Sequence, residues 1–144
     1  MQKAKWGRII HISGEDGFQG HIPGRAHNMV CKAGVHAFSK AVAIEFAADG
    51  ITANTVNPGM TDTKIMGEDA RRTLREANFP IMPPSQIADA VFRIVTGGET
   101  GECWVCQPGR EPEPYRFHDV PGPRTEGAQG RVPPGVREGT LDNG

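Results

Sequence analysis

The sequence lacks any long apolar run. None of its 144 residues belongs to a stretch approaching the roughly 18 apolar residues that cross a bilayer, so we expect no membrane partner. The first ten residues, MQKAKWGRII, also lack the apolar core of a signal peptide. Cysteine is scarce, and three residues without an export signal indicate reduced thiols and not a disulfide framework. These absences predict a cytoplasmic protein.

Neither sign of charge is in excess. The chain has 16 Lys and Arg against 17 Asp and Glu, which gives a formal net charge of -1. A nucleic-acid-binding domain usually carries a strongly basic face, so we expect no nucleic-acid partner.

Proline is uncommon in the first 106 residues and frequent afterwards. Residues 107–144 contain 7 Gly and 7 Pro, about 37% of 38 residues, against about 16% before them. A proline and glycine share above roughly 25–30% without a period is typical of disorder. We therefore expect one domain over residues 1–106 and a disordered Pro/Gly-rich tail over residues 107–144.

The first 106 residues alternate between strand-like and helix-like patterns. Short β-branched or apolar runs predict strands over 8–13, 51–56 and 102–106, each bounded by turn residues. Helical patterns cover 26–49, about 68–77 and 86–95, with Ser85 as the expected N-cap of the last. The alternating order predicts an α/β fold with parallel strands and right-handed crossovers.

The segment 26–49 carries apolar residues at helical spacing. Asp49-Gly50 supplies its stop, because glycine suits the left-handed cap. Two neighbouring apolar sets suggest that the helix is covered on two sides. The first set is Val30, Ala33, Ala37, Ala41 and Ile44, and the second is Val35, Phe38, Val42 and Phe46.

Several common catalytic motifs are missing. The sequence contains no GxSxG, HExxH, P-loop or Gly-rich dinucleotide motif. Asn28 and Lys32 are four residues apart and share a helix face after a Gly-rich loop, where α/β sheets bind ligands. A solvated helix face is the alternative interpretation of this pair.

Thr61 and Thr63 follow the Pro58-Gly59 turn at the end of a predicted strand. Exposed backbone and hydroxyl groups at such a place can bind phosphate or amide groups. Ordinary turn chemistry explains the same residues equally well.

Cys103 and Cys106 have the CxxC spacing of zinc sites. They lie in a predicted strand, where residues three apart point to opposite faces, and no second CxxC follows. We therefore predict no metal site. His27 and Cys31 have the spacing of a thiol–imidazole pair, but nothing else in the sequence supports that chemistry.

Three segments together resemble the C-terminal half of the short-chain dehydrogenase/reductase family. Lys32-Ala33-Gly34 is similar to the end of the family's Tyr-x-x-x-Lys-Ala-Gly motif. Residues 45–59, EFAADGITANTVNPG, are similar to its ExxxxGIxxNxxxPG segment, and Thr100-Gly101 to the TG that opens its last strand. The resemblance spans about residues 6–106 and implies the C-terminal half of a Rossmann-type doubly wound parallel sheet.

The resemblance also implies a chemistry. The family binds NAD or NADP and interconverts carbonyl and alcohol groups of small-molecule substrates. Lys32 matches the lysine that binds the nicotinamide ribose and lowers the pKa of a neighbouring tyrosine. Pro58, Gly59 and Thr63 match the loop that contacts the nicotinamide and pyrophosphate, and Thr61 is assigned to the same cofactor loop. Residues 60–84 match the variable substrate-binding loop.

The sequence departs from the family pattern in its catalytic residues. Asn28 stands where the catalytic tyrosine belongs, and an amide cannot act as a titrating proton donor. Gly14 aligns with the catalytic serine, with Ser13 one residue away. The Gly-rich phosphate turn of the family's N-terminal half has no counterpart here, which leaves the adenosine half of the cofactor without a predicted site.

Two hypotheses follow. The first is an NAD(P)-linked oxidoreductase whose Lys32, Asn28 and Gly14 occupy catalytic positions, with weak or no activity as this isolated chain. The second is a non-catalytic, truncated fragment that acts only through self-association or partner binding. In either case an uncovered sheet edge favours a homo-oligomer or self-association.

Overall fold

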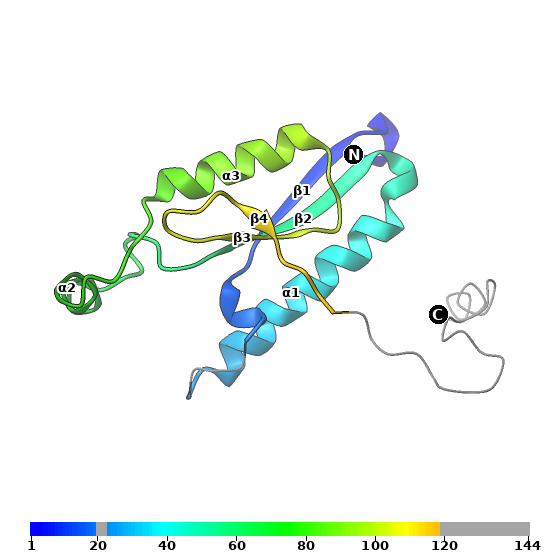
Figure 1. The fold of residues 1–144 in the computed structure, drawn as a ribbon. Helices are drawn as coiled ribbons and strands as arrows, with labels where there is room; N and C mark the ends of the chain where they lie inside the picture. Colours follow the sequence, from blue (N-terminus) through cyan, green and yellow to red (C-terminus); the bar gives the residue numbers. More distant parts are fainter. Residues whose placement is uncertain (20–22, 119–144) are drawn as a thin grey trace.

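Three parallel strands and one short antiparallel strand form a sheet in the computed structural model, which describes residues 1–19 and 23–118 (Figure 1). The strand order is β1-β2-β3-β4, with β4 antiparallel to β3. The strands are β1 (Gly7–Ile12), β2 (Ile51–Pro58), β3 (Cys103–Cys106) and β4 (Glu113–Pro114), and the α-helices are α1 (Ala26–Glu45), α2 (Glu68–Glu76) and α3 (Pro84–Gly97). The predicted α/β class with parallel strands is confirmed.

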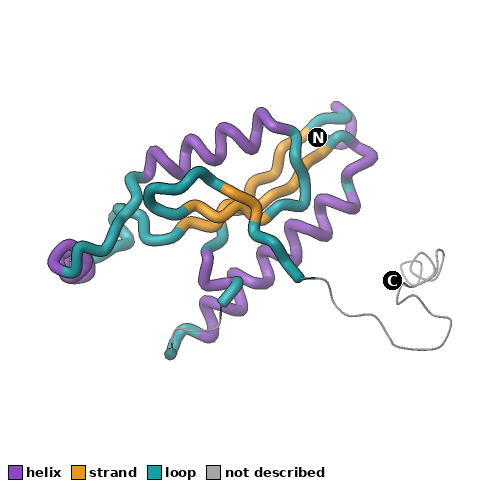
Figure 2. Tube along the Cα trace, viewed as in Figure 1, coloured by secondary structure: helices purple, strands orange, loops and turns teal. Residues whose placement is uncertain are grey.

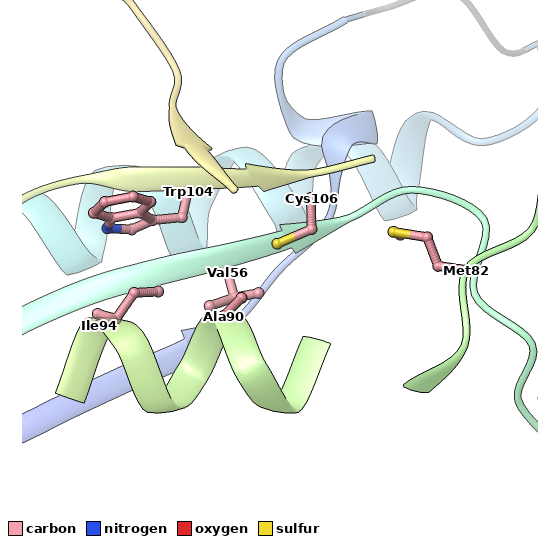
Figure 3. Close-up of a cluster of buried hydrophobic side chains, with 6 residues drawn as sticks. All are labelled: Val56, Met82, Ala90, Ile94, Trp104 and Cys106. Carbon is pink, nitrogen blue, oxygen red and sulfur yellow. The ribbon is translucent and has the colours of Figure 1, made fainter. Parts of the chain in front are cut away.

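The two long helices cover opposite faces of the sheet, while α2 lies beyond the end of the sheet (Figures 1 and 2). On the α1 face, Val42 and Ala43 pack with Ala53 of β2. On the α3 face, a second cluster joins the helix to β2 and β3 (Figure 3). This cluster comprises Val56, Met82, Ala90, Ile94, Trp104 and Cys106.

Strand β2 is the centre of the molecule. It pairs with β1 on one side and β3 on the other, and residues 51–57 are all buried. Its polar residues are therefore satisfied internally. The amide nitrogen of Asn54 donates to the carbonyl of Glu99 (2.7 Å), and its oxygen accepts from the N–H of Glu102 (3.0 Å).

Most predicted elements lie where the sequence placed them, with differences at their ends. Helix α1 stops at Glu45, and a 3₁₀ turn leads to Gly50, whose φ of 68° provides the expected left-handed cap. The expected Ser85 cap of α3 is wrong, because the helix already begins at Pro84 with Pro83 as N-cap. Proline suits this first position, since its missing N–H would have no helical partner there.

The expected burial of α1 is wrong for one face. Val30, Ala33, Ala37, Ala41 and Ile44 are exposed, and Val30 and Ile44 keep 72% and 81% of their surface accessible. The residues that pack on the sheet come mainly from the neighbouring set, including Val42. Within residues 1–19 and 23–118, no helix is both long enough and apolar enough to cross a membrane.

The first part of the expected tail packs on the domain. Residues 107–118 include β4, and the N–H of Tyr115 donates to the carbonyl of Cys103 (2.8 Å). The Tyr115 ring stacks on Phe18 with centroids 4.2 Å apart, and Phe117 contacts Tyr115 edge-on at 4.9 Å. Stacking between aromatic rings thus holds this proline-rich stretch against the domain. Residues 119–144 of the expected tail lie outside the described residues, and the division into domains stays a prediction.

Candidate functional site

A groove of about 600 Å³ lies at the carboxyl ends of β1 and β2. Its floor includes the ends of both strands, and its sides come from the loop after β2 and the start of α3. The walls are mostly carbon, with one cation and three hydroxyl groups among them. The lining residues are Ile12, Ser13, Lys32, Pro58, Gly59, Thr61, Thr63, Ile65, Pro84, Ile87, Ala88 and Val91.

All of the predicted cofactor-binding residues line this groove. Lys32 reaches it from α1, while Pro58, Gly59, Thr61 and Thr63 reach it from the end of β2 and the following loop. The topology brings them together because parallel strands place their carboxyl ends at one edge of the sheet. Their role in binding stays a prediction.

Lys32 lies against Gly14. A Cβ placed on Gly14 would be 3.7 Å from Cε of Lys32, so the lysine stem passes directly beside the predicted serine position. No ion pair within the described ranges of the chain involves Lys32. The groove is therefore bordered by a cation that no carboxylate neutralises there.

Ser13 does not replace the serine missing from position 14. Its side chain is buried, and its hydroxyl donates to the main-chain carbonyl of Lys32 (3.0 Å). Its N–H donates to the carbonyl of Val56 (2.8 Å), which continues the β1–β2 ladder. The proton of Ser13 is thus engaged in fixing α1 to the sheet.

Asn28 is separated from the groove. Its amide nitrogen donates to Oδ2 of Asp16 at 2.8 Å, in the turn that follows β1. Arg25 lies 3.8 Å from the same carboxylate oxygen. Although Asn28 is one helical turn before Lys32, it does not contribute to the groove lining. The predicted catalytic set of Lys32, Asn28 and Gly14 is therefore only partly brought together.

Gln107 does not line the groove but packs against the Gly59 turn that does, a contact that sequence reasoning missed. Its side chain lies so close to Gly59 that a Cβ there would be 2.6 Å from Oε1 of Gln107. Its amide nitrogen donates to the carboxylate of Glu15, and its main-chain carbonyl accepts from Gln86 (2.9 Å). Gly59 also donates its N–H to the carbonyl of Cys106 (2.9 Å). Gln107 was assigned to the tail on composition, and no local signal marked it.

A buried polar pair lies beneath the groove. Nε2 of His36, on α1, is 2.6 Å from the side-chain oxygen of Asn57, on β2, and donates to it. Burial lowers the pKa of His36, the hydrogen bond to Asn57 opposes that shift, and the charges of Lys32 and Lys40 lower the pKa further. The histidine is therefore held neutral and joins the helix that carries Lys32 to the central strand.

The chain has a single tyrosine, and it is not in the groove. Tyr115 stacks on Phe18, which itself stacks on His36 with centroids 4.2 Å apart. A phenol in this stack lies on the α1 side of the sheet, away from the lining of the groove. It does not supply the hydroxyl that Asn28 lacks.

The cysteines offer no metal site in the described part of the chain. Cys106 is buried in the α3-side cluster, and this burial raises the pKa of its thiol to about 11. Such a thiol stays protonated at neutral pH and is a poor metal ligand. No group of three or more His, Cys, Asp or Glu within the described residues has the arrangement of a metal centre.

Parallel strands joined by helices on both faces, with a groove at the strand ends, define a Rossmann-type α/β fold. Comparison with known families is consistent with this class. The sequence profile described as short chain dehydrogenase matches residues 1–73, about half of the chain. The protein belongs to the short-chain dehydrogenase family of oxidoreductases.

The curated relatives include reductases. An acetoacetyl-CoA reductase of Allochromatium vinosum is 36% identical over 107 residues, covering 70% of this chain and 42% of the relative. A 3-oxoacyl (acyl-carrier-protein) reductase of Vibrio cholerae is 38% identical over 96 residues, covering 63% of this chain and 39% of the relative. The chain thus spans about two fifths of the length of these relatives.

Solved structures share the fold. An oxidoreductase of the short chain dehydrogenase/reductase family from Burkholderia thailandensis superposes with a TM-score of 0.64 at 23% identity, over 73% of this chain and 44% of that one. The structure of ElxO with NADP bound superposes with a TM-score of 0.60 at 24% identity, over 73% and 46%. These matches establish the expected Rossmann-type architecture.

Proposed function

We propose that this chain carries the nicotinamide-binding part of an NAD(P)-linked oxidoreductase that interconverts carbonyl and alcohol groups of a small molecule. The observation that carries the proposal is the position of Lys32, which borders the same groove as the Pro58-Gly59 turn and the hydroxyls of Thr61 and Thr63. The family assignment and the reductase names of the relatives support it.

The groove has the chemistry that a nicotinamide riboside needs. Its volume of about 600 Å³ is within the usual range for small-molecule sites. Lys32 can donate to ribose hydroxyls, and the hydroxyl of Thr63 can pair with a carboxamide or phosphate. The hydroxyl of Thr61 donates to the carbonyl of Gly59 (3.1 Å) and keeps its oxygen as an acceptor. The apolar side chains of Ile12, Ile87 and Val91 complete the walls. The NADP carried by the similar fold of ElxO is in keeping with this choice of cofactor.

When bound, the cofactor supplies the hydride. The chain's own contribution is to bind, to orient and to exclude water. Lys32 holds the ribose and adds positive charge where an alkoxide develops. Asn28 offers a neutral amide engaged with Asp16, and Gly14 offers no hydroxyl. We therefore propose that this chain alone turns over carbonyl substrates weakly or not at all, because general acid catalysis is missing.

Binding of reduced nicotinamide mononucleotide tests the proposal directly, because this probe lacks the adenosine half of the cofactor. Lys32→Ala should weaken its affinity at least about tenfold, the order expected for a lost hydrogen bond to a charged group. Lys3→Ala, at an exposed position in the N-terminal turn, is the matched control and should leave the affinity unchanged. Equal binding by the Lys32 variant would overturn the proposal.

A non-catalytic role is the second candidate. Two observations favour it, namely the engagement of Asn28 with Asp16 and the exposed apolar face of α1 around Val30 and Ile44. In that case the chain acts through self-association or through a partner, as a homo-oligomer or a mixed assembly. Retained self-association without binding of the nicotinamide probe would favour this role. Under either candidate we place the protein in the cytoplasm, since its three cysteines are free thiols.

A further inference from the structure

Helix α2 has little apolar support, since Leu74 is its one half-buried apolar side chain. Its sequence, EDARRTLRE, buries no residue, and the helix lies beyond the end of the sheet (Figure 1). A nine-residue helix is marginal in water without tertiary support. Its position must therefore depend on specific polar contacts.

Arg71 makes these contacts. Its Nε donates to Oδ1 of Asp62 at 2.8 Å, its Nη2 donates to the carbonyl of Thr63 at 3.2 Å, and its Nη1 donates to the carboxylate of Glu68. The side chain is only 15% exposed, and Leu74 is the one other residue of the helix that is not fully exposed. A guanidinium that uses three donors on three acceptors fixes orientation more strictly than a single ion pair does.

The segment that Arg71 holds is the one that lines the groove. On its other side, the N–H of Asp62 donates to the carbonyl of Met82, and the N–H of Met82 donates to the carbonyl of Met60, both at 2.8 Å. Met82 is fully buried in the α3-side cluster (Figure 3). The loop from 60 to 63 is thus fixed by Met82 on the domain side and by Arg71 on the α2 side.

We propose that Arg71 is a positioning residue that sets the Thr61–Thr63 segment against the groove and ties α2 to it. It touches no ligand, and it acts by fixing the main chain of Thr63 and the side chain of Asp62. The part of this inference that concerns ligand affinity rests on the proposed function. The part that concerns loop order stands on the contacts alone.

The experiment compares Arg71→Ala with Arg72→Ala. Arg72 is the next residue of the same helix, is 65% exposed, and pairs only with Asp69 of its own helix among the described residues. Hydrogen exchange at the N–H groups of Asp62 and Met82 should become about tenfold faster or more in Arg71→Ala, the order that follows from losing a charged hydrogen bond. Arg71→Lys, which can restore one contact, should give an intermediate rate. Arg72→Ala should match the unaltered chain.

The affinity for reduced nicotinamide mononucleotide is measured on the same four proteins. Weaker binding in Arg71→Ala alone supports the positioning role. Unchanged exchange in Arg71→Ala overturns it, and faster exchange with unchanged affinity overturns the link to the ligand. If no protein binds the probe, the proposed function fails, while the exchange rates still decide whether Arg71 orders the loop. Thermal melts monitored by circular dichroism verify that all variants are folded.

Discussion

Gly14 and Lys32 are in van der Waals reach of each other at the mouth of the groove. A Cβ on Gly14 would lie 3.7 Å from Cε of Lys32, an ordinary contact distance. The φ of Gly14 is 177°, which is extended backbone open to any residue. A Cβ is therefore accommodated at this position without moving the lysine, which makes Gly14→Ser a reasonable substitution to test.

This geometry predicts that activity can be restored. We expect a fusion of this chain to the N-terminal part of a related reductase to reduce ketones poorly. In that fusion, Gly14→Ser combined with Asn28→Tyr should raise kcat/KM by about 10²–10⁴-fold. That is the usual contribution of general acid catalysis. NADPH oxidation with a ketone panel measures it.

The control is the same double variant with Lys32→Ala added. It should lose the gain in kcat/KM, because the ammonium group that would bind the ribose and lower the pKa of the introduced tyrosine is removed. His27, the exposed neighbour of Asn28, is the alternative donor. If the fusion with Gly14 and Asn28 already reduces ketones as fast as the Gly14→Ser, Asn28→Tyr variant, the prediction that this chain lacks a proton donor is wrong. A His27→Ala variant then shows whether that histidine donates the proton.

Asn54 should be important for stability. It is completely buried and bonds both the carbonyl of Glu99 and the N–H of Glu102, so Asn54→Ala removes the side-chain partner of two partly buried backbone groups. Each group left without a partner costs about 1–3 kcal/mol of unfolding free energy. Urea denaturation measures the loss. Thr73→Ala, exposed on α2, should change stability by less than about 0.5 kcal/mol. Equal stability of the two variants would contradict the structural role of Asn54.

His36 predicts a pH dependence of stability. Its pKa lies below the ordinary 6.5, first because of burial, so the folded protein binds a proton there less readily than the unfolded chain does. The free energy of unfolding should therefore fall as pH drops from about 7.5 through 6.5 toward the lowered pKa. Urea denaturation at several pH values follows it. His36→Gln, which keeps an amide donor for Asn57, should flatten this slope, whereas exposed His27→Gln should not. If the unfolding free energy of His36→Gln depends on pH as it does in the unaltered chain, the pH dependence comes from another titrating group.

The sequence predicts the parts of this fold that depend on local patterns. The run at 51–56 is rich in β-branched residues, which suits a strand covered on both faces, and Gly50 ends the preceding turn with a positive φ. The groove residues after β2 follow from the Pro58-Gly59 turn and strand topology. The contacts of Gln107 with Glu15 and of Arg71 with Asp62 join residues 92 and 9 positions apart and leave no periodic signal. Composition does not register which aromatic rings find partners, so it could not predict that Tyr115 stacks on Phe18.

The exposed face of α1 predicts self-association. Within the described ranges, β1 pairs with β2 alone, so its other edge presents unpaired backbone groups. Helix α1 exposes Val30, Phe38 and Ile44, with 72%, 58% and 81% of their surfaces accessible, and Phe38 lies edge-on to His11 of β1 at 5.5 Å. Apolar helix surface next to an open edge is stabilised by burial against a second copy. Light scattering after size-exclusion chromatography should therefore give a mass above the 15.5 kDa of one chain.

Charge placed on that face should reverse the association. Ile44→Glu introduces a carboxylate that the interface would have to desolvate, so the mass should fall toward that of one chain at the same concentration. Ile65→Glu is the matched control, because Ile65 is 97% exposed but lies in the loop after β2 and not on α1. Its mass should stay that of the unaltered protein. If the unaltered chain is a monodisperse monomer with a sharp cooperative melt, the prediction of self-association through the α1 face and the β1 edge is wrong.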